Sequence, residues 1–439
     1  MIGRRDPPPA GALTPDVLVV GGGMAGAMAA LAARAAQASV VLVRRAPGAT
    51  ALSSGAIGVA PDAWAPPGEP FASRLGTVAA ARRIAASRPE HPYAAIGAAL
   101  GALEEALAFA AAELGEVLAP LGPRPLQLAT PYGSAVTCAL AQRTMLAGDL
   151  ASARGVLAVV GFRGHLGFDA RLVAGGLARY QGAGAPRATA IEIDLFMREE
   201  TSIARPHELA RALEAPGAAE QAGRLLRRAL PAGAGVALFP PVLGLSPASR
   251  VMERIAAEAG VPVAETVADV PSVPGLRLQA ALDTRLAAAG VQVVPAELTG
   301  ATGPGAPARA GDRDVRARSW VLATGRFVGG GIVRRARLAE PLLGIPVQAS
   351  VNGESGAHLA VRPPTALTLR ERRAAQPLLA AGLRVDGLLR PLGGSDAPVH
   401  PRLFAAGAIV GGHEQAVDGT GLGVAIVTGY LAGRHAASD

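Results

Sequence analysis

The sequence predicts an α/β protein with a Rossmann-like domain that is discontinuous in the chain and carries an inserted α+β domain. Three observations predict this fold class. The stretch 17–45, VLVVGGGMAGAMAALAARAAQASVVLVRR, has the pattern of a strand, a glycine-rich turn, a helix and a second strand. Another apolar strand with a glycine near its end, SWVLATGRF, lies at 319–327, and residues 402–437 read as strand, glycine-rich loop and helix. One domain built from both ends of the chain, interrupted by another domain, accounts for this order.

The composition fits a globular chain with room for two or three cores. Of its 439 residues, 50% are apolar and 17% are charged. The net charge of +8 is spread without a long basic run, which argues against a nucleic-acid partner. The single cysteine, Cys138, excludes an internal disulfide framework and an iron–sulfur cluster held by this chain alone. We expect no metal site, no secretory signal and no membrane span.

Changes of pattern along the chain predict five segments. The nucleotide-binding domain is expected to resume after each insertion, and a helix at 276–289 followed by a strand at 291–294 begins its second part. The predicted segments are 14–90 (nucleotide-binding domain, first part), 91–270 (inserted substrate or cap domain), 271–335 (second part), 336–382 (minor insertion) and 383–439 (third part).

The glycine-rich turn carries the phosphate-binding pattern Gly21-x-Gly23-x-x-Gly26. The first glycine permits a tight turn, the second lets the backbone approach a pyrophosphate, and the third lets the helix pack on the strand. The helix N-terminus offers N–H groups to the phosphates. We therefore predict that Gly21, Gly23, Met24, Ala25 and Gly26 bind the cofactor.

The second strand ends in Arg44 and Arg45, where such units usually carry an acidic residue. A carboxylate there accepts hydrogen bonds from ribose hydroxyls, whereas arginine has no acceptor. Four explanations stay open for Arg44: it clamps a 2′-phosphate, it leaves the adenosine half held by other groups, it marks a mononucleotide without adenosine, or it faces solvent without a role.

Further loops of small residues favour a flavin as the cofactor. They follow the second strand, the strand at 319–327, the strand near 404 and the turn before the last helix, whose N-terminus would favour negative charge on a reduced flavin. A second glycine fingerprint, which a nicotinamide site would need, is missing from the middle of the chain. The predicted cofactor-binding residues in these loops are Ser53, Ser54, Gly55, Ala56, Ala323, Thr324, Gly325, Gly407, Ala408, Gly421, Leu422 and Gly423.

Eight passages, in order along the chain, carry a resemblance to a known family. The chain resembles the B-type subunit of anaerobic glycerol-3-phosphate dehydrogenase, within the fumarate-reductase-like group of flavoproteins. The passages are GATALSSGAI (48–57), ATPYGSAVTCA (129–139), LFPPVLGLS (238–246), PSVPGLRLQAAL (271–282), VLATGRFVGGGI (321–332), EPLLGIPV (340–347), GLRVDGLLRPL (382–392) and FAAGAIVGG (404–412).

The resemblance implies a flavin-bearing cytoplasmic subunit that reaches the inner membrane only through partners. Those partners are a catalytic flavoprotein subunit and an iron–sulfur subunit, and the complex oxidises glycerol 3-phosphate to dihydroxyacetone phosphate with electrons passing to quinone. It also implies FMN, which we favour slightly over FAD. In that case Arg44→Glu should change binding little, whereas with FAD a carboxylate at this position should tighten binding by about 1 kcal/mol.

Two features depart from the pattern of the wider group. Its late strand carries an acidic residue for the ribityl hydroxyls, and here that position is Ala408. A clear set of substrate arginines is also missing, so the chain is expected to relay electrons, with His413 as the candidate catalytic residue. The alternatives are a stand-alone fumarate-reductase-like dehydrogenase or reductase, and a nucleotide-binding scaffold subunit without a redox role.

Overall fold

The structure is a computed structural model that describes residues 11–60, 76–165, 167–179, 187–195, 205–351, 354–371 and 376–438. It divides into two compact units. The first unit consists of 1–49, 81–106 and 283–439, and the second of 50–80 and 107–282. Three helices run across the boundaries: α2 (Thr77–Ser87), α4 (Leu103–Glu113) and α9 (Val273–Ala288).

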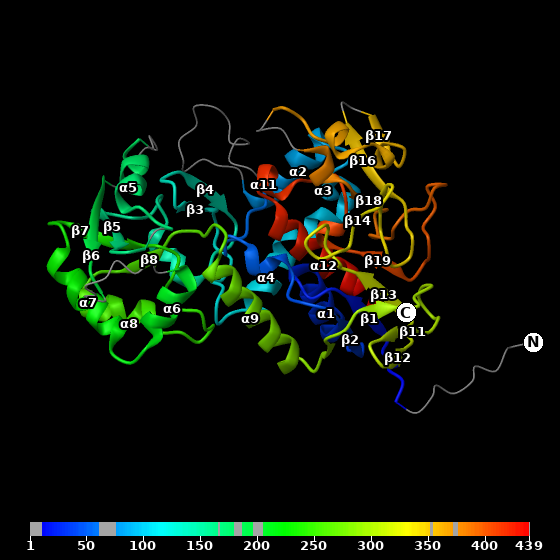
Figure 1. Cartoon of the computed structure of the whole chain (residues 1–439), viewed down its shortest axis with the longest axis horizontal. Helices are drawn as coiled ribbons and strands as arrows, with labels where there is room; N and C mark the ends of the chain where they lie inside the picture. Colours follow the sequence, from blue (N-terminus) through cyan, green and yellow to red (C-terminus); the bar gives the residue numbers. More distant parts are fainter. Residues whose placement is uncertain are drawn as a thin grey trace, which may run out of the picture. The chain divides into compact units, whose positions relative to one another are not determined.

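A five-stranded parallel sheet lies at the centre of the first unit (Figure 1). Its order is β19 (Leu403–Ala405), β13 (Ser319–Leu322), β1 (Val17–Val20), β2 (Val40–Val43) and β9 (Gln292–Val294). Strands β1, β2, β13 and β19 are buried along their whole length, which explains their continuous apolar runs. The strand expected over 319–327 ends early, because the chain turns at Gly325 with a φ of +73°.

Helices α1 (Met24–Ala35) and α12 (Gly421–Ala437) pack on this sheet and on each other. Two glycines of α12 permit the close approach. A Cβ on Gly429 would overlap the carbonyl oxygen of Ala25, and a Cβ on Gly433 would overlap that of Ala29. Because these glycines present no side chain, the backbones of the two helices come into direct contact.

Smaller elements complete the first unit. Antiparallel pairing joins β10 to β11 and β12, β14 to β15, and β16 to both β17 and β18. These strands are β10 (Leu298–Thr299), β11 (Ala308–Ala310), β12 (Arg313–Val315), β14 (Val333–Arg334), β15 (Leu338–Ala339), β16 (Val347–Val351), β17 (Glu354–Gly356) and β18 (Gly382–Leu383). The short helices are α3 (Pro92–Ala95), α10 (Pro377–Ala380) and α11 (Gln415–Asp418).

The second unit has a four-stranded parallel sheet of its own, in the order β6 (Arg187–Ile193), β5 (Val156–Phe162), β7 (Ala234–Phe239) and β8 (Val263–Glu265). Alternate residues of β5 enter different cores. Val160 and Phe162 join a cluster with α6 (Pro206–Glu214), α7 (Ala218–Ala229) and α8 (Val251–Ala259). Leu157 and Val159 join a cluster with α5 (Ala170–Ala178). Helices therefore cover both faces of the sheet.

A β-hairpin of β3 (Leu126–Ala129) and β4 (Ala135–Cys138) also belongs to the second unit. Its last residue is the buried Cys138. The helix expected at 276–289 is α9, which begins three residues earlier, and the strand expected at 291–294 is β9. Within the described ranges, no helix combines the length and the apolar character needed to cross a bilayer.

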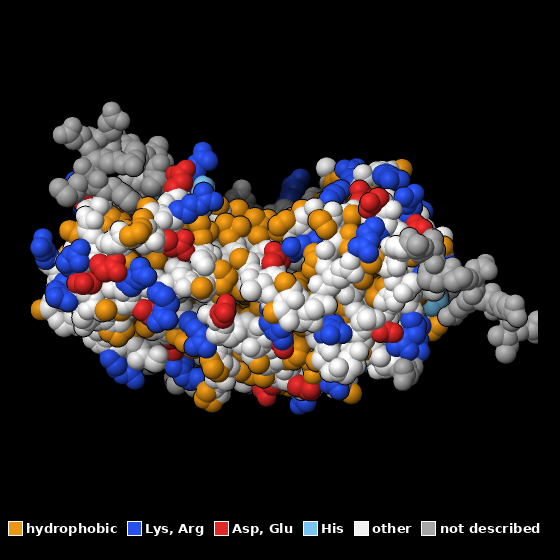
Figure 2. Space-filling model, turned by 90° about the horizontal axis from the view of Figure 1, so that it is seen from below, with side chains coloured by type: hydrophobic (Ala, Val, Ile, Leu, Met, Phe, Trp, Pro, Cys, Tyr) orange, Lys and Arg blue, Asp and Glu red, His pale blue; other side chains and the backbone are white. Residues whose placement is uncertain are grey.

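Charged side chains of both signs are mixed over the face drawn in Figure 2. Ion pairs between exposed residues occur in both units. Arg163 pairs with Glu192 in the second unit at 3.3 Å, and Arg434 pairs with Glu105 in the first at 3.1 Å. Exposed pairs of this kind contribute little to stability. Each unit is therefore stabilised mainly by its own buried core.

Candidate functional site

The turn after β1 is shaped by backbone contacts that leave no room for side chains. Gly21 has a φ of +118°, and its N–H donates to the Val43 carbonyl at 2.8 Å. A Cβ on Gly21 would overlap the carbonyl oxygen of Ala323, and a Cβ on Gly26 would overlap the carbonyl oxygen of Gly21. The turn thus joins the carboxyl ends of β1, β2 and β13, where parallel sheets of this type bind ligands.

Helix α1 begins directly after this turn without a side-chain cap. Gly23 is its N-cap and, having no side chain, forms no side-chain cap. The first turn carries no acidic residue, and its residues Met24, Ala25 and Gly26 are buried. Uncapped N–H groups and the positive end of the helix dipole suit a phosphate group.

The returning strands bring two more predicted residues to the start of α1. Ala323 donates its N–H to the Val20 carbonyl at 2.8 Å, and this contact continues the sheet beyond the end of β13. Gly407, with a φ of +73°, lies so close to α1 that a Cβ there would be 2.5 Å from the Ala25 Cβ. Gly21, Ala25, Ala323 and Gly407 therefore form one nest of small residues, and Ala408 follows it in a short 3-10 turn.

Two buried hydroxyl groups lie in the loops that follow β13 and precede α12. The Oγ1 atoms of Thr324 and Thr420 are buried and make no hydrogen bond to a described residue. Thr420 is also the N-cap of α12, but its side chain caps no N–H group. Gly421, Leu422 and Gly423 form the uncapped first turn of α12, which again has no acidic residue. Unsatisfied hydroxyls and uncapped N–H groups are what a polar ligand would pair with.

Arg44 does not face solvent. Its side chain passes over the glycine turn, because a Cβ on Gly22 would overlap the Arg44 Cδ atom. The Arg44 guanidinium donates from Nη1 to Oδ1 of Asp283 at 2.5 Å. The exposed fractions of the two side chains are 17% and 36%, so the pair is half-buried. The explanation of Arg44 as a solvent-facing residue without a role is therefore wrong.

His413, the predicted catalytic residue, lies in a buried polar cluster of the first unit. Only 1% of it is exposed, and its ring meets that of His91 edge-on with centroids 5.8 Å apart. Burial lowers the pKa of His413 well below its ordinary value, the charges of Arg326, His91 and Arg88 act in the same direction, and the Gly411 backbone opposes weakly. His413 is thus neutral at physiological pH, and its catalytic role stays a prediction.

The same cluster contains a buried arginine that the sequence did not single out. Arg326 follows Gly325 and donates to the backbone carbonyls of His413 at 3.1 Å, Val410 at 3.3 Å and Leu379. It thereby ties the loop that follows Gly407 to the end of β13. Burial lowers the pKa of Arg326 to about 10, so the guanidinium keeps its charge.

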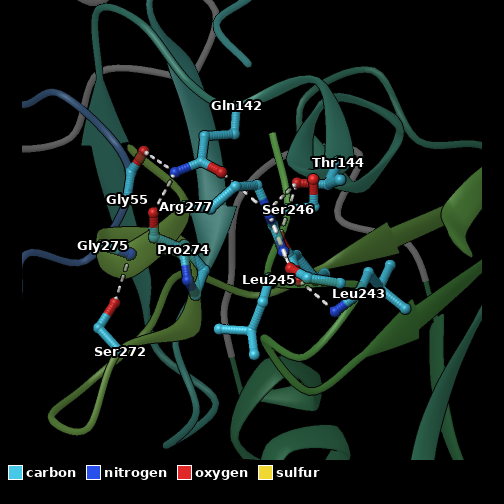
Figure 3. Close-up of polar contacts among 12 residues, drawn as sticks. Gly55, Gln142, Thr144, Leu243, Leu245, Ser246, Ser272, Pro274, Gly275 and Arg277 are labelled. Carbon is cyan, nitrogen blue, oxygen red and sulfur yellow. Dashed lines mark hydrogen bonds and ion pairs between the residues drawn. The ribbon is translucent and has the colours of Figure 1, made fainter. Parts of the chain in front are cut away.

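The predicted residues Ser53, Ser54, Gly55 and Ala56 belong to the second unit, and Figure 3 shows Gly55 with the side chain of Gln142 beside it. Gly55 has a φ of +85°, and a Cβ there would overlap Pro274. The Gln142 side-chain amide donates to the carbonyls of Gly55 at 3.3 Å and Pro274 at 2.8 Å. The Ser272 hydroxyl donates to the Ser53 carbonyl at 2.5 Å. This loop is therefore held to the start of α9.

An ion pair of the second unit fixes the side chain of Gln142. Arg277 donates to the Gln142 side-chain oxygen at 2.7 Å and pairs with Glu265 at 2.7 Å. Thr144 and the Leu243 N–H donate to the two oxygens of Glu265 at 2.6 and 2.9 Å. Figure 3 shows these contacts converging from separate segments of the second unit. The exposed fractions of the Arg277 and Glu265 side chains are only 3% and 0%.

Metal ligation has no support in the parts of the chain that the structure describes, because no group of three or more His, Cys, Asp or Glu residues there could hold an ion. The sequence reasoning missed Asp283, Arg326 and Arg277. A charged residue directly after a buried strand and its glycine could have drawn attention to Arg326. Asp283 had no signal, because its contact with Arg44 depends on strand pairing across the chain.

Comparisons with known proteins agree with this geometry. The model of the FAD binding domain family matches residues 16–424. The probable B-type subunit of anaerobic glycerol-3-phosphate dehydrogenase from Halobacterium salinarum is 30% identical over 449 residues, covering 97% of this chain and 98% of the relative. The chain belongs to the FAD binding domain family and, within it, to the B-type subunits of anaerobic glycerol-3-phosphate dehydrogenase. The B-type subunit of Yersinia pestis bv. Antiqua is 28% identical with the same coverage.

Membership of the FAD binding domain family confirms the α/β flavoprotein fold and makes the chain a flavin-dependent oxidoreductase. The family supports FAD as the flavin and gives no support to the preference for FMN. A solved 3-ketosteroid-Δ4-(5α)-dehydrogenase from Rhodococcus jostii RHA1 aligns over 97% of both chains with 15% identity and a TM-score of 0.42.

Proposed function

We propose that this chain is the FAD-bearing B-type subunit of a glycerol-3-phosphate dehydrogenase that passes electrons to quinone through partner subunits. The observation that carries the proposal is the nest of Gly21, Ala25, Ala323 and Gly407 at the uncapped start of α1. The names of the relatives, which align over nearly their whole length, supply the reaction.

The residues of the first unit fit a flavin nucleotide. The N-terminus of α1 would hold the phosphates, since its N-cap Gly23 brings no side-chain cap and its first turn carries no acidic residue. The orphaned hydroxyls of Thr324 and Thr420 would pair with polar atoms of the cofactor. Ala408 stands where the wider group has an acidic residue for the ribityl hydroxyls. One of the two threonine hydroxyls can take over that contact, because a hydroxyl both donates and accepts. We propose that Ser53, Ser54, Gly55 and Ala56 complete the cofactor-binding set.

A flavin bound here supplies the two-electron carrier of the reaction. The uncapped start of α12 offers N–H groups and a positive dipole end where negative charge develops on reduction. The buried Arg326 adds a fixed positive charge in the same unit. His413 and Tyr93 of the same unit are buried, and electrostatic effects are stronger in such a low-dielectric environment.

We propose that the partners are a catalytic flavoprotein subunit and an iron–sulfur subunit. Oxidation of glycerol 3-phosphate to dihydroxyacetone phosphate removes two electrons and two protons, and the electrons need a path to quinone. The single cysteine of this chain cannot ligate an iron–sulfur cluster alone. The relay therefore passes to a partner at the cytoplasmic face of the inner membrane.

The test is to purify the full chain, record its visible spectrum and identify the released cofactor by chromatography. We expect a yellow protein that releases FAD and oxidises glycerol 3-phosphate poorly with an artificial acceptor when it is alone. A colourless chain that takes up neither FAD nor FMN would overturn the redox role. Strong activity of the chain alone would overturn its proposed role as an electron relay and would identify this chain as the catalytic subunit.

A further inference from the structure

The Arg44–Asp283 ion pair lies at the end of β2, where the sequence has an arginine in place of the usual acidic residue. A Rossmann unit normally places a carboxylate there for the ribose hydroxyls, and Arg44 offers only donors. The structure brings a carboxylate to the end of the Arg44 side chain from 239 residues further along the chain. The Arg44 Nη1 atom and the Asp283 Oδ1 atom are 2.5 Å apart, which is a charge-assisted hydrogen bond.

Strand pairing explains why Asp283 lies there. Helix α9 leads into β9, and β9 pairs in parallel with β2, with Val43 opposite Val294. The pairing continues past the strand end, because the Arg44 N–H donates to the Val294 carbonyl at 3.1 Å. Asp283 precedes this strand on α9, and its carboxylate meets the side chain of Arg44, which follows the carboxyl end of β2.

We propose that Asp283 supplies the acceptor for the adenosine ribose hydroxyls of FAD and that Arg44 positions its carboxylate. This inference rests on the proposed function. A carboxylate offers about four acceptor sites, so it can accept from several partners at once. The Asp283 side chain is 36% exposed, so a ligand can reach it. The pair also argues against a 2′-phosphate clamp, because such a phosphate would meet the negative charge of Asp283.

The experiment removes the flavin from the full chain and measures the dissociation constants of FAD and FMN. Asp283→Ala should weaken FAD about tenfold, the loss of one hydrogen bond to a charged group, and leave FMN within about twofold. Asp283→Asn, which keeps the size and one acceptor oxygen, should fall between Asp283→Ala and the unmodified chain. Thermal melting of each variant confirms that it folds.

A matched control is Glu297→Ala. Glu297 lies 4.0 Å from Arg45, the neighbour of Arg44, and both side chains of that pair are about two-thirds exposed. The control makes the same change of charge beside the neighbouring arginine, and we expect it to leave the ratio of FAD to FMN affinity unchanged.

Arg44→Glu gives a second test. The sequence alone predicts that a carboxylate at position 44 tightens FAD. The ion pair reverses this expectation, since two carboxylates would then repel each other and displace Asp283. We expect Arg44→Glu to weaken FAD at least as much as Asp283→Ala does.

Several results would overturn the inference: equal effects of Asp283→Ala on FAD and FMN, no effect on either, or tighter FAD, which would mean that the pair blocks an adenosine half. Tighter FAD in Arg44→Glu would also overturn it. Failure of the unmodified chain to bind any flavin would instead reject the proposed function, so the two failures are distinguishable.

Discussion

Among the described residues, each unit contains one buried arginine, and only one of the two pairs with a carboxylate. In the second unit, Arg277 pairs with the buried Glu265, whose oxygens also accept from Thr144 and Leu243. In the first unit, Arg326 donates only to backbone carbonyls, and no carboxylate among the described residues forms an ion pair with it. The negative charges of Glu414 and Asp418 raise the pKa of Arg326, but burial has the larger effect and lowers it.

This difference separates a cluster that satisfies its own polar atoms from one that does not. The Arg277 cluster balances its own charge and satisfies its polar atoms within the fold, so its role is to hold α9, β8 and the Gly55 loop together. The region around Arg326 keeps a positive charge and contains buried hydroxyl and imidazole atoms without partners among the described residues. Such atoms are costly to bury unless a ligand pairs with them.

The largest effect is expected where the buried ion pair is broken. Arg277→Met removes one partner and leaves the Glu265 charge buried and unpaired. We expect a loss of about 4 kcal/mol in the free energy of unfolding, measured by urea denaturation. The double variant Arg277→Met, Glu265→Leu should recover most of that loss, because no uncompensated charge then remains.

The matched control for the ion pair is Arg163→Met. Arg163 pairs with Glu192 in the same unit, but both side chains are more than half exposed. Its loss should cost less than about 1 kcal/mol. Equal costs for the two arginines would contradict the structural role of the Arg277 cluster.

The next largest effect is expected in the first unit, on ligand binding and not on folding. Gly23→Val places a branched side chain at the N-cap of α1, in the space that a phosphate needs. The backbone tolerates valine there, since the φ of Gly23 is −84°. We expect FAD to bind at least about 100-fold more weakly, about 2.7 kcal/mol, with a nearly unchanged melting temperature.

Gly175→Val is the control for that substitution. Gly175 lies in α5 of the second unit, and a Cβ there meets open space. This variant should keep its full flavin content. Full flavin occupancy in Gly23→Val would show that the ligand does not bind at the glycine turn, and the contrast between the two units would then lose its basis.

The sequence predicted the parts of this comparison that depend on local pattern. The apolar run of β1, the glycine turn and the buried helix α1 follow each other in the chain, so periodicity and glycine spacing are enough to recognise them. The contact of Arg44 with Asp283 could not be predicted in this way. It depends on the pairing of β2 with β9, which the order of residues does not specify.

The position of Arg326 after a strand and its glycine could have drawn attention to it, but its burial could not be predicted from the sequence. Charged residues are almost never fully buried without a partner, so a charged residue after a strand is normally assigned to the surface. Its side chain is instead enclosed by backbone carbonyls from segments 53 to 87 residues further along the chain. Local propensity carries no information about such distant partners.

A smaller effect is expected when the charge of Arg326 is removed. A positive charge in a buried site favours the additional negative charge of a reduced flavin. We expect Arg326→Gln to lower the midpoint potential of the bound flavin by about 30 mV, about 1.4 kcal/mol for two electrons. Arg326→Lys keeps the charge and should lie close to the unmodified chain. Equal shifts in both variants, measured by spectroscopic redox titration, would mean that Arg326 acts only by tying the loop.

The smallest effect concerns the buried imidazoles beside Arg326. Burial, aided by the charge of Arg88, lowers the pKa of His91 from 6.5 to about 3. Below pH 6.5 the unfolded chain therefore binds a proton that the folded chain excludes. Above pH 6.5, His91 does not lower the free energy of unfolding. As the pH falls from 6.5 toward 3, its protonation in the unfolded chain lowers that free energy progressively. The pKa of His413 is lowered in the same direction.

His91→Asn isolates this contribution. The His91 Nδ1 atom accepts the Tyr93 N–H at 3.1 Å and caps α3, and asparagine can keep that cap without titrating. Between pH 7 and pH 5.5, urea unfolding should show that the variant loses about 1 kcal/mol less stability than the unmodified chain. Equal losses would mean that His91 takes up its proton in the folded chain. The polar atoms around Arg326 would then be solvated like those of a surface, and the contrast with the closed Arg277 cluster would disappear.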